Sequence, residues 1–210
     1  MHQSIYLASQ SPRRAELLKQ LGVRFELLLP QANEDAEALE IQLECEASID
    51  YVARVTLAKL EAARVRLSKL NKPWAPILSA DTTVAINTDQ GELILGKPNN
   101  HEHALEILSE LNGKTHIVHT AVAILPSADE SPLINVSSSE VSFGQWPLEK
   151  LQAYVKTNEP MGKAGAYGIQ GIGGSLIAKF DGSYSGIMGL PLFETSLLLD
   201  QIGIKFALTI

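Results

Sequence analysis

The sequence predicts an α/β fold, a twisted mixed sheet flanked by helices. Segments with strand-like alternation or short apolar runs take turns along the chain with segments of helical periodicity, which is typical of this class. Two strand-like segments, 115–125 and 133–146, follow each other with only a polar loop between them, so we expect part of the sheet to be antiparallel. The 210 residues, 45% hydrophobic and 20% charged, suffice for one domain, residues 1–210, with a sizeable core.

The N-terminal part is predicted to form a strand, a helix and a second strand. Residues 4–8 are a short apolar strand. Ser11 and Pro12 suit the N-cap and the first position of a helix, and Gly22 ends it. Residues 23–29 then show the alternation of a strand.

The middle of the chain begins with an acidic loop, residues 33–48, that has no clear pattern. It leads into elements that we expect in this order: a long helix at about 49–70, a buried strand at 77–86, a turn at 87–91, a strand at 92–95 and an amphipathic helix at 101–111. After the strand pair come a helix from Pro147 to about 156, an irregular glycine-rich stretch at 159–174, a strand at 175–180 and a closing helix at 191–202.

The composition excludes some classes of binding partner and favours one cellular compartment. The net charge of −7 argues against a general nucleic-acid binder, which would show a basic face. No apolar stretch reaches the roughly 18 residues of a membrane span, and the first residues lack the basic and apolar parts of a secretory signal. Cys45 is the single cysteine, which fits a reducing compartment. We therefore expect a cytoplasmic protein with no membrane partner.

The segment 9–14 runs from a predicted strand into a helix N-terminus. Ser9 precedes the helix, and Arg13 and Arg14 lie in its first turn. Free backbone N–H groups and the helix dipole attract an anion there, and arginine can hold a phosphate through two hydrogen bonds. The alternative is a capped helix with two solvated arginines.

Asp81 is one charge inside the apolar run 77–86. Burying a carboxylate is costly unless it is paired or bound to a metal. Ligands of α/β folds bind beyond the carboxyl ends of strands, where an aspartate can serve as general base or metal ligand. The alternative is an aspartate that ends the strand and caps a turn.

Two lysines are candidates for binding phosphate. Lys59 lies on the apolar side of the long helix, where extending its ammonium to solvent is the simpler explanation. Lys97 lies in a segment, 91–98, that nearly matches a P-loop, but Pro98 stands where the magnesium-binding Ser or Thr would be. A P-loop is therefore rejected, and Lys97 stays a loop lysine available to an anion.

The stretch 159–174 contains six glycines. Such a loop allows close approach of backbone to a ligand, although it is not a dinucleotide-binding fingerprint. Lys163 and Gln170 lie within it. The alternative is a flexible surface loop.

Six segments together resemble the Maf family, in the family's order and over nearly the whole chain: 7–18, 51–59, 79–82, 96–98, 159–171 and 182–192. The acidic segment 33–48 is longer than in the usual pattern. The resemblance implies a metal-dependent pyrophosphatase that cuts a nucleoside triphosphate between its α- and β-phosphates. It also implies two lobes around a deep cleft, a fold related to the inosine-triphosphate pyrophosphatases, and a homodimer.

The resemblance also implies roles for individual residues. Asp81 matches the proton-accepting aspartate, and Glu34 matches an acidic position that we assign, with Asp81, to a divalent metal, Mg²⁺ or Mn²⁺. The matching polar and cationic positions of the cleft are Ser9, Arg13, Arg14, Lys59, Lys97 and Lys163.

Three positions indicate the branch of the family. Arg13, Thr82 and Gln170 resemble the residues typical of the branch that hydrolyses dTTP and UTP. In that branch a glutamine amide could match the hydrogen-bond donor and acceptors of a pyrimidine base. The alternatives are the 7-methyl-GTP branch, whose pattern differs at the second and third positions, and a non-catalytic nucleotide-binding regulator of septum formation.

Overall fold

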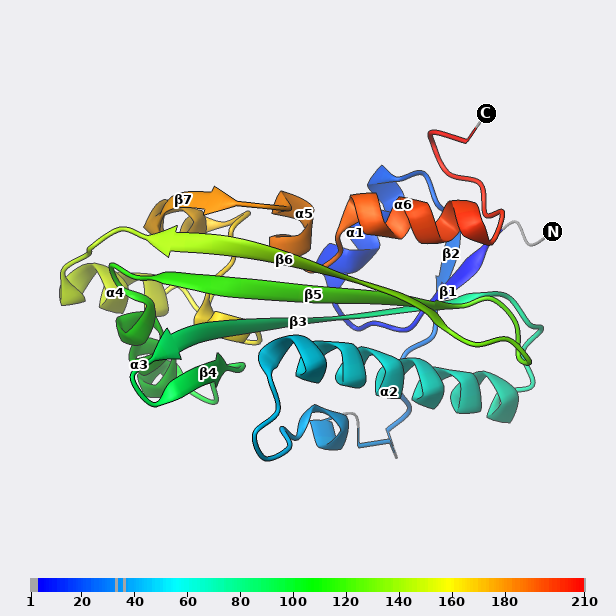
Figure 1. The fold of residues 1–210 in the computed structure, drawn as a ribbon, viewed down its shortest axis with the longest axis horizontal. Helices are drawn as coiled ribbons and strands as arrows, with labels where there is room; N and C mark the ends of the chain where they lie inside the picture. The colour runs from blue at the N-terminus through cyan, green and yellow to red at the C-terminus, as the bar shows by residue number, and fades with distance from the viewer. Residues whose placement is uncertain (1–3, 33, 36, 210) are drawn as a thin grey trace.

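The computed structural model describes residues 4–32, 34–35 and 37–209, and this part of the chain forms a seven-stranded mixed sheet (Figure 1). The strand order is β2-β1-β3-β5-β6-β7, with β4 paired to β3 outside that path. β1 pairs in parallel with β2 and β3, and the remaining pairings are antiparallel. The strands are β1 (Ile5–Leu7), β2 (Phe25–Leu27), β3 (Ile77–Thr88), β4 (Gly91–Leu95), β5 (Thr115–Leu125), β6 (Leu133–Phe143) and β7 (Ile177–Asp181).

Helices cover both faces of this sheet. They are α1 (Pro12–Gln20), α2 (Ser48–Lys69), α3 (His101–Leu111), α4 (Leu148–Val155), α5 (Tyr184–Met188) and α6 (Leu192–Gln201), with 3₁₀ turns η1 (Glu37–Glu40), η2 (Ala164–Ala166) and η3 (Ile172–Leu176). The predicted fold class, a mixed sheet flanked by helices, is confirmed. None of the helices in these residues is both long enough and apolar enough to span a bilayer.

Helix α2 packs on one face of the sheet, and α1 and α6 pack on the other (Figure 1). The apolar residues of α2 recur at helical spacing, so Leu60, Ala63 and Leu67 are buried on one side of it. Leu17 and Leu18 of α1 are buried in the same way on the opposite face. Burying each large aliphatic side chain contributes about 1.5–3 kcal/mol, so these stripes fix the helices on the sheet.

The other end of the sheet has its own core. Helices α3 and α4 pack there with η2 and the distal parts of β3, β5 and β6. Asn100 caps α3 by accepting a hydrogen bond from the His103 amide at 2.8 Å, which satisfies a free N–H of the first turn. The predicted helix at 101–111 and strand at 115–125 are confirmed residue for residue.

Several predicted boundaries were wrong. The strand predicted at 133–146 ends at Phe143, because its partner β5 begins at Thr115, which pairs with Ser142. The strand predicted at 175–180 begins only at Ile177, because η3 continues to Leu176. Helix α5 was not predicted at all, since its five residues are too few to show a period.

One edge of β3 is only partly paired, and this gap positions the site. β1 pairs with β3 only at Ile77 and Leu78, and β4 pairs with it from Val84 onward. On the opposite edge, β5 pairs continuously with residues 77–85. Residues 79–83 of β3 therefore lie just beyond the carboxyl end of β1, where α/β folds commonly bind ligands.

Candidate active site

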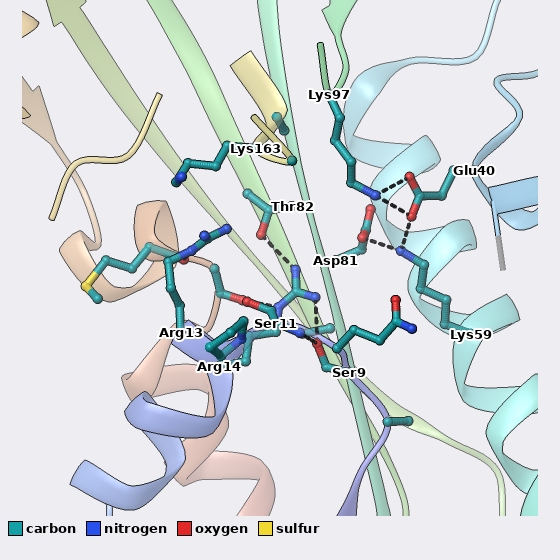
Figure 2. Close-up of a pocket in the computed structure, with 18 of the residues that line it drawn as sticks. Ser9, Ser11, Arg13, Arg14, Glu40, Lys59, Asp81, Thr82, Lys97 and Lys163 are labelled. Carbon is teal, nitrogen blue, oxygen red and sulfur yellow. Dashed lines mark hydrogen bonds and ion pairs between the residues drawn. The ribbon is translucent and has the colours of Figure 1, made fainter. Parts of the chain in front are cut away.

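A cavity of about 570 Å³ opens beside this gap. Its walls come from α1, η1, α2, β3 and the loops around Lys97 and Lys163 (Figure 2). Every site residue predicted from the sequence lines it: Ser9, Arg13, Arg14, Glu34, Lys59, Asp81, Thr82, Lys97, Lys163 and Gln170. Segments far apart in the chain thus bring these polar groups to one place.

Asp81 lies in the interior of β3, with its side chain at the cavity. The position predicted inside the strand is confirmed, and the alternative of an aspartate that ends the strand and caps a turn was wrong, because β3 continues to Thr88. Asp81 instead lies past the end of the neighbouring β1. The residue is 8% exposed, and its Oδ1 accepts a hydrogen bond from Lys59 Nζ at 2.6 Å. The ion pair offsets the cost of burying the carboxylate.

Lys59 does not extend to solvent from α2. Its ammonium also donates to Glu40 Oε1 at 2.8 Å. Lys97 donates to both oxygens of the same carboxylate, at 2.9 and 2.7 Å. Burial by itself would raise the pKa of Glu40, but Lys59 and Lys97 outweigh it and hold that pKa below its usual value. We call these four residues, Asp81, Glu40, Lys59 and Lys97, the paired side of the cavity.

Arg14 is bound into the floor of the cavity. Its guanidinium donates to the Gly189 carbonyl at 2.7 Å and to the hydroxyls of Ser9 and Thr82, both at 3.2 Å. Burial lowers the pKa of Arg14; Asp81 partly offsets this effect, and Arg13 adds to it. Arg14 thereby connects α1 to β3 and to the loop after α5.

Arg13 and Lys163 have no carboxylate partner among the described residues. Arg13 Nε donates to the Met188 carbonyl at 3.3 Å, and Lys163 Nζ donates to the Glu159 carbonyl. Burial lowers the pKa of both groups, and Arg13 lowers that of Lys163 further. With Arg14 they form the open side of the cavity, whose positive charges attract an anion. The two sides face each other in Figure 2.

The glycine-rich stretch is joined to neighbouring parts of the fold by backbone and side-chain contacts. Gly165 donates its backbone N–H to the Gly96 carbonyl at 3.2 Å, which joins the loops that carry Lys97 and Lys163. Tyr167 is 6% exposed, and its hydroxyl lies 2.9 Å from His116 Nε2. This buried contact anchors the wall of the cavity next to Gln170.

Glu34 lines the cavity but has another partner. Arg66 binds both of its oxygens, at 2.9 and 3.1 Å through Nε and at 2.6 Å through Nη2. The hydrogen bond from Arg66 lowers the pKa of Glu34. Across the described part of the chain, no group of three or more His, Cys, Asp or Glu side chains is placed to hold a metal ion.

Sequence reasoning missed Glu40 and the carbonyls of Met188 and Gly189. Glu40 lies in the acidic segment, where neighbouring glutamates look alike and no periodicity separates one from another. Only the fold brings it to Lys59 and Lys97. The two carbonyls carry no side-chain signal, because a backbone acceptor is present at every residue.

Comparison with known proteins gives concordant matches. Residues 4–202 match the family model described as Maf-like protein. A dTTP/UTP pyrophosphatase of Burkholderia lata is 53% identical over 97% of this chain and 95% of its own length. Those of Albidiferax ferrireducens and Cupriavidus pinatubonensis are 50% and 49% identical, each over 98% of this chain and their full length.

Among solved structures, the Staphylococcus aureus Ham1 protein matches with a TM-score of 0.42 and 13% identity. The match covers 67% of this chain and 71% of that one.

Proposed function

This chain belongs to the Maf-like protein family, and on that premise we propose that it is a nucleoside triphosphate pyrophosphatase acting on dTTP and UTP. The products are the nucleoside monophosphate and pyrophosphate. One observation carries the proposal: a buried aspartate, held by a lysine, faces a cavity lined by five further cationic or polar side chains, those of Ser9, Arg13, Arg14, Lys97 and Lys163. A protein that only binds nucleotides would not need a proton acceptor in that position.

The open side of the cavity supplies the first contact with the triphosphate. Arg13 and Lys163 form no ion pair with a carboxylate of the described chain, so a polyphosphate can bind them without first displacing one. Arg14 is held by Gly189 and Thr82 and keeps its place without a ligand. Preorganised cations stabilise the charge that develops on the phosphoryl oxygens in the transition state.

Asp81 serves as general base in the hydrolysis. It accepts a proton from water, the water oxygen forms a bond to phosphorus, and the bond from that phosphorus to the bridging oxygen between the α- and β-phosphates breaks. The electron pair leaves with the bridging oxygen. Lys59, bonded to Asp81 Oδ1, holds the carboxylate in one orientation for this transfer.

A divalent metal, Mg²⁺ or Mn²⁺, fits the donor set. Mg²⁺ is commonly held by one or two carboxylates together with substrate phosphates. Asp81 Oδ2 has no hydrogen-bond partner in the described residues and is the first candidate ligand. Glu34 could join it only after leaving Arg66. When bound, the metal would neutralise phosphate charge and favour ionisation of water.

Thr82 and Gln170 are our candidates for recognising the base. Both line the cavity, Thr82 from β3 and Gln170 from the glycine-rich stretch. A glutamine amide offers a donor and an acceptor, which match the imide face of uracil or thymine. A site built for such bonds rejects bases that leave them unpaired.

The test is pyrophosphate release from a panel of nucleotides with Mg²⁺ or Mn²⁺: dTTP, UTP, 5-methyl-UTP, 7-methyl-GTP and ITP. We expect release to be fastest with the pyrimidine nucleotides. Release confined to 7-methyl-GTP would reject the substrate assignment, and no release from any nucleotide would favour a binding regulator.

A further inference from the structure

The paired side of the cavity contains a carboxylate that the hydrolytic step does not use. Glu40 presents two oxygens to two ammonium groups: Oε1 accepts from Lys59 and from Lys97, and Oε2 accepts from Lys97. Two lysines that converge on two oxygens of one anion form an arrangement suited to a phosphoryl group. Glu40 thus has the charge and the contacts that a substrate phosphate would have there (Figure 2).

We propose that Glu40 is a specificity-determining residue, which occupies the phosphate position on Lys59 and Lys97 and is displaced by a polyphosphate. The inference rests on the proposed function, because it takes the cavity to be a polyphosphate site. A ligand that reaches the paired side must replace the ion pairs of Glu40. A single phosphate bound by Arg13 and Lys163 leaves the ion pairs of Glu40 intact.

The structure allows Glu40 to leave. Its side chain is 25% exposed and that of Lys97 is 50% exposed, so solvent can receive the displaced carboxylate. Glu40 is the last residue of η1, a turn of four residues. The backbone of this turn is fastened separately, by the Tyr51 hydroxyl, which donates to the Glu40 carbonyl at 2.7 Å.

Glu40 is not needed to keep the catalytic aspartate in place. Lys59 contacts Asp81 Oδ1 directly at 2.6 Å, and this ion pair does not involve Glu40. Lys97 has Glu40 as its only carboxylate partner among the described residues, so its ammonium becomes available to the ligand. Displacement therefore exposes two cations and leaves the base oriented.

The experiment is calorimetric titration with inorganic pyrophosphate, without divalent metal, of the intact protein and three variants. Glu40→Gln removes the competing charge and should tighten pyrophosphate binding about tenfold. Tyr51→Phe loosens the turn but keeps the carboxylate, and we expect a smaller gain, about threefold. Glu44→Gln removes an exposed charge of the same segment, outside the cavity lining, and should match wild type.

Weaker or unchanged pyrophosphate binding by Glu40→Gln would overturn the proposal. A loss that appears only when Mg²⁺ is added would also overturn it, and would assign Glu40 to the metal. Because calorimetric titration needs no turnover, it tests the role of Glu40 independently of the proposed pyrophosphatase function. Tighter binding without hydrolysis of any nucleotide would reject the proposed function alone, and dTTP hydrolysis without a Glu40 effect would reject this inference alone.

Discussion

Individual residues in this cavity differ most in whether their charges already have partners. Asp81 and Glu40 neutralise Lys59 and Lys97, whereas Arg13 and Lys163 face the cavity without a carboxylate in the described chain. Arg13 and Lys163 are half-buried, and partial burial of a cation without a carboxylate partner is costly for the free protein. That cost is recovered when an anion binds, which explains why so acidic a protein keeps cations here.

Away from the charges, His116 is a buried group that must stay neutral in the fold. It is 1% exposed, and burial lowers its pKa from 6.5 to about 4. His116 binds a proton near pH 6.5 in the unfolded chain but only near pH 4 in the folded chain. The contribution of its neutral form to the free energy of unfolding is therefore complete above pH 6.5 and is lost as the pH falls toward 4.

We therefore expect the free energy of unfolding to fall by about 2 kcal/mol between pH 7 and pH 5 because of His116. Urea denaturation at the two pH values measures it. The glutamine in His116→Gln does not titrate but can still form a hydrogen bond with Tyr167. The variant should therefore lack the part of the decrease in the free energy of unfolding that His116 causes. Equal decreases in wild type and variant would show that His116 does not titrate as described.

Thr120 connects three elements behind the cavity. Its hydroxyl, on β5, donates to the Gly186 carbonyl of α5 at 2.7 Å and lies 3.0 Å from Thr82 Oγ1 on β3. The residue is 1% exposed, so both contacts are out of water. Thr82 is in turn bonded by Arg14, and the connection continues to α1.

Thr120→Val should lower the free energy of unfolding by about 1–3 kcal/mol, because the Gly186 carbonyl loses its buried partner. It should also raise KM for dTTP more than it lowers kcat, because Thr82 loses a fixed orientation. Thr120→Ser keeps the hydroxyl and should restore KM. A valine variant with wild-type stability and KM would contradict the connection.

The turn η2 fixes the glycine-rich stretch against β3. Gly165 has φ +68°, and a Cβ there would lie 2.9 Å from Val84 Cγ2. Gly162 has φ +71° but nothing within 4 Å of an added Cβ. The two glycines share a left-handed conformation and differ in available space.

Gly162→Ala should therefore cost about 1–2 kcal/mol of stability from backbone conformation alone. Gly165→Ala should cost about 1–3 kcal/mol more, because the methyl group meets a packed side chain. The midpoints of urea denaturation of the two variants measure the difference. Equal losses would show that the contact with Val84 is relaxed without cost.

Across the whole molecule, the cavity exists because β3 is longer than β1. Past the end of β1, one edge of β3 is free for residues 79–83. Separately packed cores lie toward the two ends of the sheet, one at the distal end and one on each face at the other end. The N-terminal segments bring Arg13 and Arg14, and the distal loops bring Lys97 and Lys163.

Sequence patterns predicted those helices and strands whose position is determined by residues within one segment. Helix α3 was found at its predicted bounds because its apolar stripe lies within one segment. The site residues were found because ordered motifs carry them. Glu40 was not found, because its contacts with Lys59 and Lys97 span 19 and 57 residues. The metal and the homodimer stay predictions.

The most direct measurement follows dTTP hydrolysis by wild type and Asp81→Asn, with the products separated by chromatography. We expect wild type to form dTMP and pyrophosphate in equal amounts. Asp81→Asn should keep its fold and turn over roughly 10²–10⁴ times more slowly, the contribution of a general base. Formation of dTDP and phosphate by wild type, or near-normal turnover by Asp81→Asn, would contradict the account.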